Sequence, residues 1–286
     1  MLLAPPYGKK KLRLARAEPH SRRRHCTSAR CRKSAASKRF RVFFGCGENC
    51  LGEAPKNGRI HAGTSGWAYA AWKPAFYPAK LAAAKFLTYY ASRLNSVEVN
   101  FTFRRFPTEK LLRGWIEATP PEFEFAIKAH QKITHVLRLR GAAEFTADFV
   151  ESLQPLAGAG KLGPVLFQLP PFLKCDLGLL QEFLASWPRN VRATFEFRHP
   201  SWFCEETLAA LRKANVALCL AESEKLETPE VQTADFLYLR LRKPGYLKTA
   251  LRRRVGVLRE RGELYVYLKH EDTPEGALLA ESLLQA

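Results

Sequence analysis

Short apolar stretches alternate with longer amphipathic stretches along the chain from Arg59 onward. The short stretches have the length and composition of strands, whereas the longer ones have a helical period. The predicted strands are 60–66, 96–102, 123–129, 164–170, 192–198, 216–222, 236–242 and 263–269. The predicted helices are 81–93, 109–118, 146–157, 177–187, 205–214, 247–260 and 274–284, with at most a short helix in 222–233.

This order of elements predicts an α/β fold, because a crossover helix between successive strands makes those strands parallel. Eight strand–helix units within about 225 residues fit a single eight-stranded parallel β/α (TIM-type) barrel, which we assign to residues 58–286. The alternative is a doubly wound open sheet. That fold normally has a glycine-rich phosphate loop, and the chain contains no GxGxxG or GxxxxGK motif.

Alternation inside the predicted strands directs several charged residues into the lumen of the barrel. Glu98 lies between two valines, Glu196 between two phenylalanines and Arg240 between two leucines. Lys128 likewise follows an apolar residue, Ile127, near the end of its predicted strand. Alternate residues of a barrel strand face inward, and active sites of β/α barrels lie at the C-terminal strand ends. We therefore expect these four residues to converge at the barrel mouth.

The residue types of this cluster indicate acid–base chemistry on an anionic or hydroxyl-rich small molecule. We predict Glu98 and Glu196 as general acid and base, if their surroundings separate their pKa values, and His199 as a proton shuttle. Basic residues would bind an anionic group, amides would bind hydroxyls, and aromatic residues would stack on a sugar or base. The predicted ligand-binding residues are Ser65, Trp67, Asn100, Lys128, Gln168, Arg198, Trp202 and Arg240.

Structural interpretations compete with these assignments. The charged residues also fit an ion network that only stabilises the barrel, although so many charges are unusual in a lumen that is normally apolar. Packing onto the barrel rim is an equal alternative for Trp67 and Trp202. No HExxH motif or closed cysteine cluster occurs, so the sequence assigns no metal and no cofactor.

The segment 1–57 differs from the rest of the chain and is expected to form a disordered basic leader. Residues 1–50 hold 14 Lys and Arg against two acidic residues, and so contribute +12 of the net charge of +19. Such a segment has too little apolar surface to fold alone. It fits a basic arm for nucleic acid or anionic surfaces, an organelle transit peptide, or a start site assigned too far upstream.

Cysteine usage and hydropathy indicate a soluble, cytoplasmic protein. Seven cysteines without a pairing pattern suggest reduced thiols, and no apolar run approaches the roughly 18 residues of a membrane helix. Four cysteines lie in the leader, where a zinc site with His20 or His25 would need unusual spacings. These are Cys26, Cys31, Cys46 and Cys50.

The motifs of the body, in order, resemble the YecE-like family, known as domain of unknown function seventy-two. They are GTSGWAYAAW (63–72), FYP (76–78), VEVNFTF (97–103), FAIKA (125–129), ITH (133–135), FQLPP (167–171), EFRHPSW (196–202), YLRL (238–241) and YVYLKHEDTPEGA (265–277). The resemblance implies a β/α barrel and no established activity. His270 and Glu271 stand where many members have two asparagines.

Three functions remain open from the sequence. The first is a hydrolase or isomerase acting on a sugar-like or phosphate-bearing molecule, favoured by two carboxylates beside a basic cluster. The second is a nucleic-acid-binding or nucleic-acid-processing barrel, favoured by the basic body and by Arg252–Arg254. The third is a non-catalytic ligand-binding barrel.

Overall fold

Eight parallel strands are joined in the order β1-β8-β7-β6-β5-β4-β3-β2, which confirms the predicted TIM-type barrel. The computed structural model describes residues 58–222, 226–269 and 273–285. The predicted leader, its candidate zinc ligands and His270 with Glu271 lie outside these residues. The strands are β1 (Ile60–Thr64), β2 (Ser96–Val99), β3 (Glu124–Lys128), β4 (Leu162–Gln168), β5 (Ala193–Glu196), β6 (Ala217–Glu222), β7 (Phe236–Leu241) and β8 (Glu263–Leu268).

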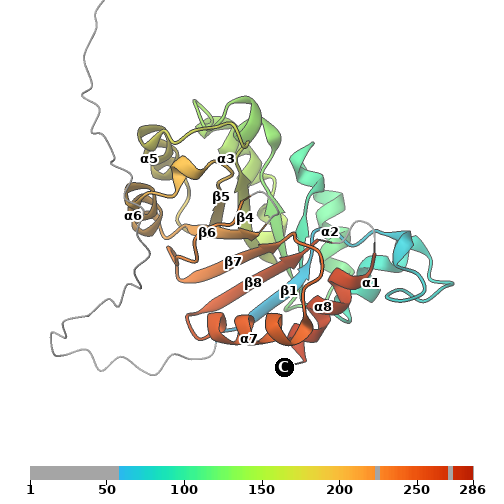
Figure 1. The fold of residues 1–286 in the computed structure, drawn as a ribbon. Coiled ribbons are helices and arrows are strands. Elements are labelled where there is room, and N and C mark those ends of the chain that lie inside the picture. Colours follow the sequence, from blue (N-terminus) through green and yellow to red (C-terminus); the bar gives the residue numbers. More distant parts are fainter. Residues whose placement is uncertain (1–57, 223–225, 270–272, 286) are drawn as a thin grey trace, which may run out of the picture. The chain divides into compact units, whose positions relative to one another are not determined.

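Helices cover the outside of the strands (Figure 1), and α7 and α8 pack against the strands β8 and β1. Outward-facing apolar residues such as Phe125, Phe195 and Leu239 are fully buried between strands and helices. The helices are α1 (Phe86–Ala91), α2 (Glu109–Glu117), α3 (Ala143–Glu151), α4 (Gln154–Gly158), α5 (Leu177–Ser186), α6 (Glu205–Ala214), α7 (Lys248–Arg259) and α8 (Glu275–Leu284). Among the described helices, none has the length and apolar character needed to cross a membrane.

Several predicted elements differ from the observed ones along part of their length, and two of them are instructive. The predicted helix 146–157 is two helices, α3 and α4, and Pro155 stands in the first turn of α4. Proline has no N–H and clashes with the preceding turn, so a continuous helix is disfavoured there. The predicted strand 96–102 ends at Val99 and continues as a 3₁₀ turn at Phe101–Phe103.

The barrel closes between β1 and β2 through side chains more than through a backbone ladder. The described backbone pairing at this seam is a single bridge between Ser65 and Glu98. The Asn95 amide donates to one carbonyl of β1 at 2.7 Å and accepts from one N–H of β1 at 2.9 Å. The Tyr90 hydroxyl accepts from the N–H of Thr64 and donates to the carbonyl of Ser96. These bonds satisfy backbone groups that would otherwise be orphaned at an open edge.

The lumen has a middle layer of mostly apolar side chains between two polar layers. The middle layer contains Ala126, Leu166, Cys219, Tyr238 and Tyr267, all fully buried. It separates a polar group at the N-terminal strand ends from the charged cluster at the mouth. The cluster at the mouth is where β/α barrels place their active sites.

Candidate active site at the barrel mouth

Arg240 lies at the centre of the mouth and joins the two predicted catalytic carboxylates. Its Nε and Nη2 atoms donate to the two oxygens of Glu98 at 2.7 and 2.8 Å, and Nη1 donates to Oε2 of Glu196. Arg240 is 4% exposed. A guanidinium suits this position because its planar donors match two carboxylates at once and it stays charged.

Every side of the Glu98 carboxylate is occupied by a donor. Besides Arg240, it accepts from the Ser65 hydroxyl at 2.6 Å, the Tyr238 hydroxyl at 2.9 Å and Arg242 at 3.0 Å. Complete burial raises the pKa of Glu98, but the guanidinium groups of Arg240 and Arg242 lower it more, well below its usual value. Glu98 is therefore ionised at neutral pH and has no proton to donate.

Glu196 ends β5 and lies beside Gln168 at the end of β4. Gln168 Nε2 donates to Glu196 Oε1 at 2.9 Å. Burial raises the pKa of Glu196, while Arg240 and the Gln168 amide lower it further than burial raises it. Since both carboxylates have lowered pKa values, their surroundings do not separate them into an acid and a base.

Lys128 has no ion pair within 4 Å among the described residues. Its Nζ donates to Gln168 Oε1 at 2.9 Å and lies 4.4 Å from the centre of the Phe103 ring. Burial and then the charge of Arg240 lower the pKa of Lys128 to about 8. Lys128 is thus a cation at neutral pH, and no carboxylate of the described residues contacts it.

Asn100 follows β2 and lines the same cavity as Lys128. Its Oδ1 atom is buried and has no hydrogen-bond partner in the described part of the chain. An unsatisfied buried acceptor costs free energy, so a hydroxyl or N–H of a ligand would be favoured there.

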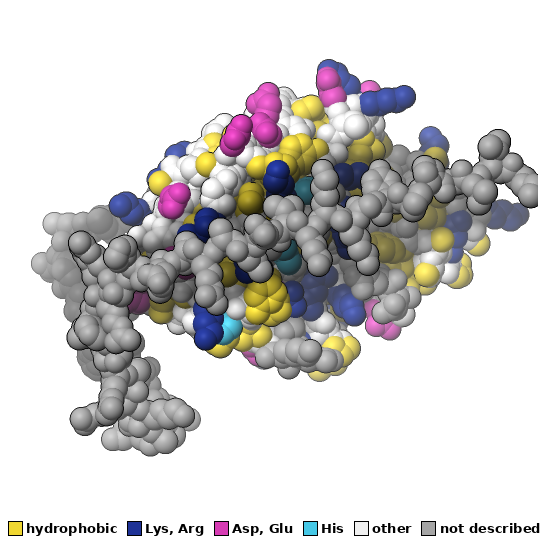
Figure 2. Space-filling view, turned by 90° about the horizontal axis from the view of Figure 1, so that it is seen from above, with side chains coloured by type: hydrophobic (Ala, Val, Ile, Leu, Met, Phe, Trp, Pro, Cys, Tyr) yellow, Lys and Arg dark blue, Asp and Glu magenta, His cyan; other side chains and the backbone are white. Residues whose placement is uncertain are grey.

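The cavity of the mouth has a volume of about 1310 Å³, which is larger than the roughly 300–1,000 Å³ of typical small-molecule sites. Six of the predicted residues line it, namely Asn100, Lys128, Gln168, Glu196, Arg198 and Arg240, and Arg198 is the exposed one among them. Ser65 and Glu98 lie behind Arg240 and Arg242. One face of the molecule, seen from above, gathers Lys and Arg side chains near its middle (Figure 2).

Besides Ser65 and Glu98, three further predicted residues do not line this cavity. Trp202 is 1% exposed, stacks on Phe197 and donates its indole N–H to the carbonyl of Leu173. Trp67 packs edge-on against a tryptophan of α2. His199 accepts from the N–H of Ser201 through Nδ1 and is not among the residues that line the cavity. Trp202 is thus a core residue, and the partly buried Trp67 packs against the core, so packing explains both tryptophans better than stacking on a ligand.

Several cavity residues were not assigned a role from the sequence. Arg242 lies two residues after Arg240, so the alternation along the strand directs both into the lumen. It donates to both Ser65 and Glu98. Tyr69, in the loop after β1, belongs to the GTSGWAYAAW motif. Loop residues have no periodic signal in the sequence that would place them at the mouth. They include Lys243 and Tyr246, while Lys248 is the first residue of α7.

The basic rim expected at Arg252–Arg254 is largely occupied by contacts within the chain. Arg254 pairs with Glu222 and Glu230, and Arg252 donates to the carbonyl of Ser282. Arg253 is exposed. These contacts leave less free positive charge on α7 for nucleic acid than the sequence suggested.

Comparison with known proteins assigns the family. The model of the protein family described as "Protein of unknown function DUF72" matches residues 61–286. The chain belongs to the DUF72 family. This confirms the resemblance to the YecE-like proteins, and it leaves the activity open.

Relatives of this DUF72 chain support the same assignment. It is 31% identical over 169 residues to the UPF0759 protein YunF of Bacillus subtilis (strain 168), covering 54% of this chain and 57% of YunF. The chain therefore spans less than two thirds of that relative.

Solved structures of the family share the fold. A DUF72 family protein from Thermotoga maritima MSB8 has 27% identity and a TM-score of 0.68, over 80% of this chain and all of that one. A DUF72 family protein from Enterococcus faecalis V583 has 18% identity and a TM-score of 0.66, over 79% of this chain and 96% of that one.

Proposed function

We propose that this DUF72 chain is a cytoplasmic enzyme, a hydrolase or isomerase, whose mouth cavity binds a small anionic molecule bearing hydroxyls, such as a sugar phosphate. The observation that supports this most directly is Lys128. The arginines of the cluster already contact Glu98 or Glu196, whereas Lys128 faces the cavity without a carboxylate in contact. A ligand anion would supply the missing countercharge.

The remaining polar groups fit the rest of such a ligand. Asn100 Oδ1 would accept from a hydroxyl, and Arg198, whose side chain is 44% exposed, would bind the anion from the rim. Neutral acceptors for hydroxyls beside a cation for a phosphate are the pattern expected for a sugar phosphate.

We assign the acid–base roles from the protonation states. Glu196 is ionised and borders the cavity, so it would accept a proton from the substrate or from a water molecule. Lys128, with a pKa of about 8, would donate one. Gln168 contacts both, which fixes their relative position. Glu98 would act as a positioning residue, because it holds Arg240 and does not line the cavity.

Binding of inorganic sulfate, measured by calorimetry, tests the anion site. Lys128→Met should weaken sulfate about 10- to 100-fold, the worth of a charge-assisted hydrogen bond. Lys132→Met is the matched control, because Lys132 also lies over a phenylalanine ring, at 4.2 Å from Phe145, but does not line the cavity. Equal binding by wild type and Lys128→Met would refute the site.

A screen of sugars and sugar phosphates then tests catalysis. Glu196→Gln should abolish turnover of any compound that the wild type converts while sulfate binding persists. If a compound binds at Lys128 but is never converted, the non-catalytic barrel is correct. If only nucleic acid binds, and its affinity falls with salt, the nucleic-acid function is favoured.

A further inference from the structure

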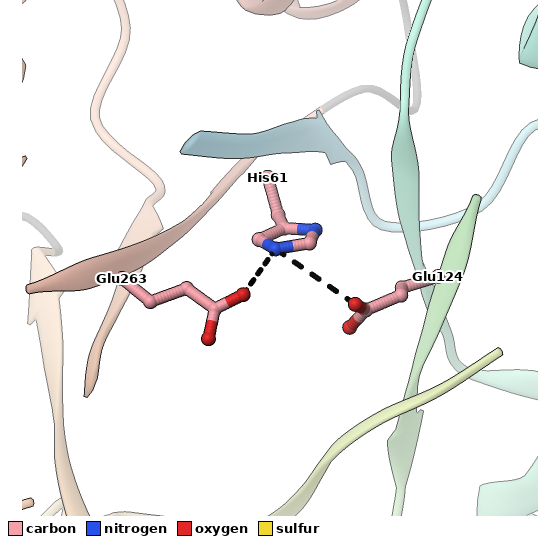
Figure 3. A group of neighbouring side chains, drawn as sticks. All are labelled: His61, Glu124 and Glu263. Atoms are coloured by element: carbon pink, nitrogen blue, oxygen red, sulfur yellow. Dashed lines mark hydrogen bonds and ion pairs between the residues drawn. The ribbon is translucent and has the colours of Figure 1, made fainter. Parts of the chain in front are cut away.

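The N-terminal end of the barrel contains a second polar group, remote from the mouth. His61 on β1, Glu124 on β3 and Glu263 on β8 point toward one another (Figure 3). His61 is fully buried, and the side chains of Glu124 and Glu263 are 18% and 23% exposed. The middle layer of the lumen lies between this group and the mouth, so the proposed reaction does not use it.

One atom of each side chain faces the centre of the group. His61 Nε2 lies 2.6 Å from Glu263 Oε1 and 3.9 Å from Glu124 Oε1. These three atoms all lie within 4.8 Å of one another. A tetrahedral ion at about 2.0–2.2 Å from each ligand sets its ligand atoms about 3.4 Å apart. Its binding would therefore replace the hydrogen bond between His61 and Glu263, whose atoms would move apart from 2.6 Å, and would draw Glu124 Oε1 closer than 3.9 Å.

The second oxygen of each carboxylate is held by an outer donor. The Tyr265 hydroxyl donates to Glu124 Oε2 at 2.8 Å, and Arg192 donates to Glu263 Oε2 at 2.5 Å. These donors orient both carboxylates with Oε1 toward His61. Metal ligands in proteins typically have such outer-shell partners, which fix their orientation.

We propose that His61, Glu124 and Glu263 bind one divalent transition-metal ion, with Zn²⁺ the best match. One imidazole and two carboxylates, with room for water on the exposed side, suit a four-coordinate zinc ion. The charges agree, because two carboxylates and the Arg192 guanidinium sum to −1 before the ion binds. His61 Nδ1 is buried and has no partner among the described residues, so it can take the hydrogen that leaves Nε2, although without the acceptor that usually orients a metal-bound histidine.

The ion would connect the two sides of the barrel seam. His61 and Glu263 come from adjacent strands β1 and β8, whereas Glu124 lies across the seam on β3, beside β2. Since the described backbone pairing of β1 with β2 is a single bridge, a shared ion would stabilise the closed barrel. The site would therefore have a structural role, which is the usual role of the N-terminal face.

The test uses the full chain without a histidine tag, treated with a chelator and titrated with Zn²⁺ and Co²⁺. Leader cysteines are replaced by serine in every protein compared, to remove competing thiolates. Calorimetry should show one Zn²⁺ per chain, and the ion should raise Tm. The Co²⁺ complex should show tetrahedral visible bands without thiolate charge transfer, which distinguishes it from a site at Cys175 and Cys204.

Glu124→Gln and His61→Asn should each weaken this binding at least tenfold and remove the rise in Tm. Glu124→Gln keeps an acceptor for Tyr265 and so provides a folded variant if His61→Asn does not fold. Glu281→Gln is the matched control, because Glu281 pairs with Arg93 and has a similar exposure of 20%. Absence of ion binding in the wild type, unchanged binding in Glu124→Gln, or thiolate bands alone would overturn the proposal.

Discussion

Lys128 differs from the other cations of the mouth in its state of charge as well as in its contacts. Arg240 and Arg242 are guanidinium groups held by carboxylates, and they remain charged over the whole physiological range. Lys128 has a pKa lowered to about 8 by burial and by Arg240, so it loses its charge at a pH that experiments reach easily. The anion affinity of the cavity should report this loss.

We predict that sulfate binding weakens as pH rises through about 8, because the neutral amine no longer attracts the anion. Sulfate is the suitable probe, since its own charge is constant in this range. Lys128→Arg should keep its affinity at high pH because an arginine stays protonated. Calorimetry from pH 6.5 to about 9.5 measures both proteins. A wild-type affinity that is flat with pH would contradict Lys128 as the anion-binding cation.

Period-two alternation was enough to place Glu98, Lys128, Glu196 and Arg240 in one lumen. It did not reveal which carboxylate meets which arginine, because Arg240 and Glu98 are 142 residues apart in the chain. Nor did it reveal that Trp67 and Trp202 pack away from the cavity. Aromatic residues next to polar motifs have the composition of a stacking site. Whether such a ring packs into the core or faces a ligand depends on the tertiary fold, which the local sequence does not show.

The seam between β1 and β2 brings the backbones of the two strands close together with little backbone pairing. Gly63 belongs to the GTSGWAYAAW motif and lies on β1, where β2 approaches closely. A Cβ at this position would lie 2.0 Å from the carbonyl oxygen of Ser96 and 2.8 Å from the Tyr90 hydroxyl.

We therefore predict that Gly63→Ala lowers the free energy of unfolding by about 1–3 kcal/mol or more, because backbone must move to relieve the clash. Gly114→Ala is the control, since that glycine lies inside α2 with no atom within 4 Å of the added Cβ. There alanine should raise stability by about 0.5–1 kcal/mol. Urea unfolding measures both, and equal effects would contradict a tightly packed seam.

At the level of elements, the sequence predicted the eight strands and their order of alternation with helices. It overestimated continuity at 146–157, where Pro155 divides the helix, and in 96–102, where a 3₁₀ turn replaces the last strand residues. It could not predict the seam, because Asn95 and Tyr90 satisfy backbone groups of β1 only once the barrel closes. The group of His61, Glu124 and Glu263 was missed for the same reason, since its ligands come from three strands that lie far apart in the chain.

For the whole chain, most of the excess charge lies in residues 1–50, which contribute +12 of +19. Several basic residues of the described part are paired with carboxylates, as Arg254 is with Glu222 and Glu230. Non-specific affinity for nucleic acid follows the number of phosphates neutralised. If the full chain binds nucleic acid, the charge distribution assigns that binding to the basic leader and not to the barrel mouth.

We predict that replacing Arg22, Arg23 and Arg24 by glutamine weakens binding of duplex DNA by the full chain and reduces its salt slope. With about 0.9 counterions released per phosphate contact, three lost contacts reduce the slope by up to about 2.7. The control replaces three exposed cations of the barrel, Lys80, Arg104 and Lys110, and should have a smaller effect. Sulfate binding at Lys128 should be the same in both triple variants, because neither changes the cavity. Fluorescence anisotropy over a range of salt concentrations measures the slopes. Equal losses in the two variants would show that the whole basic surface, and not the leader alone, contacts the phosphates.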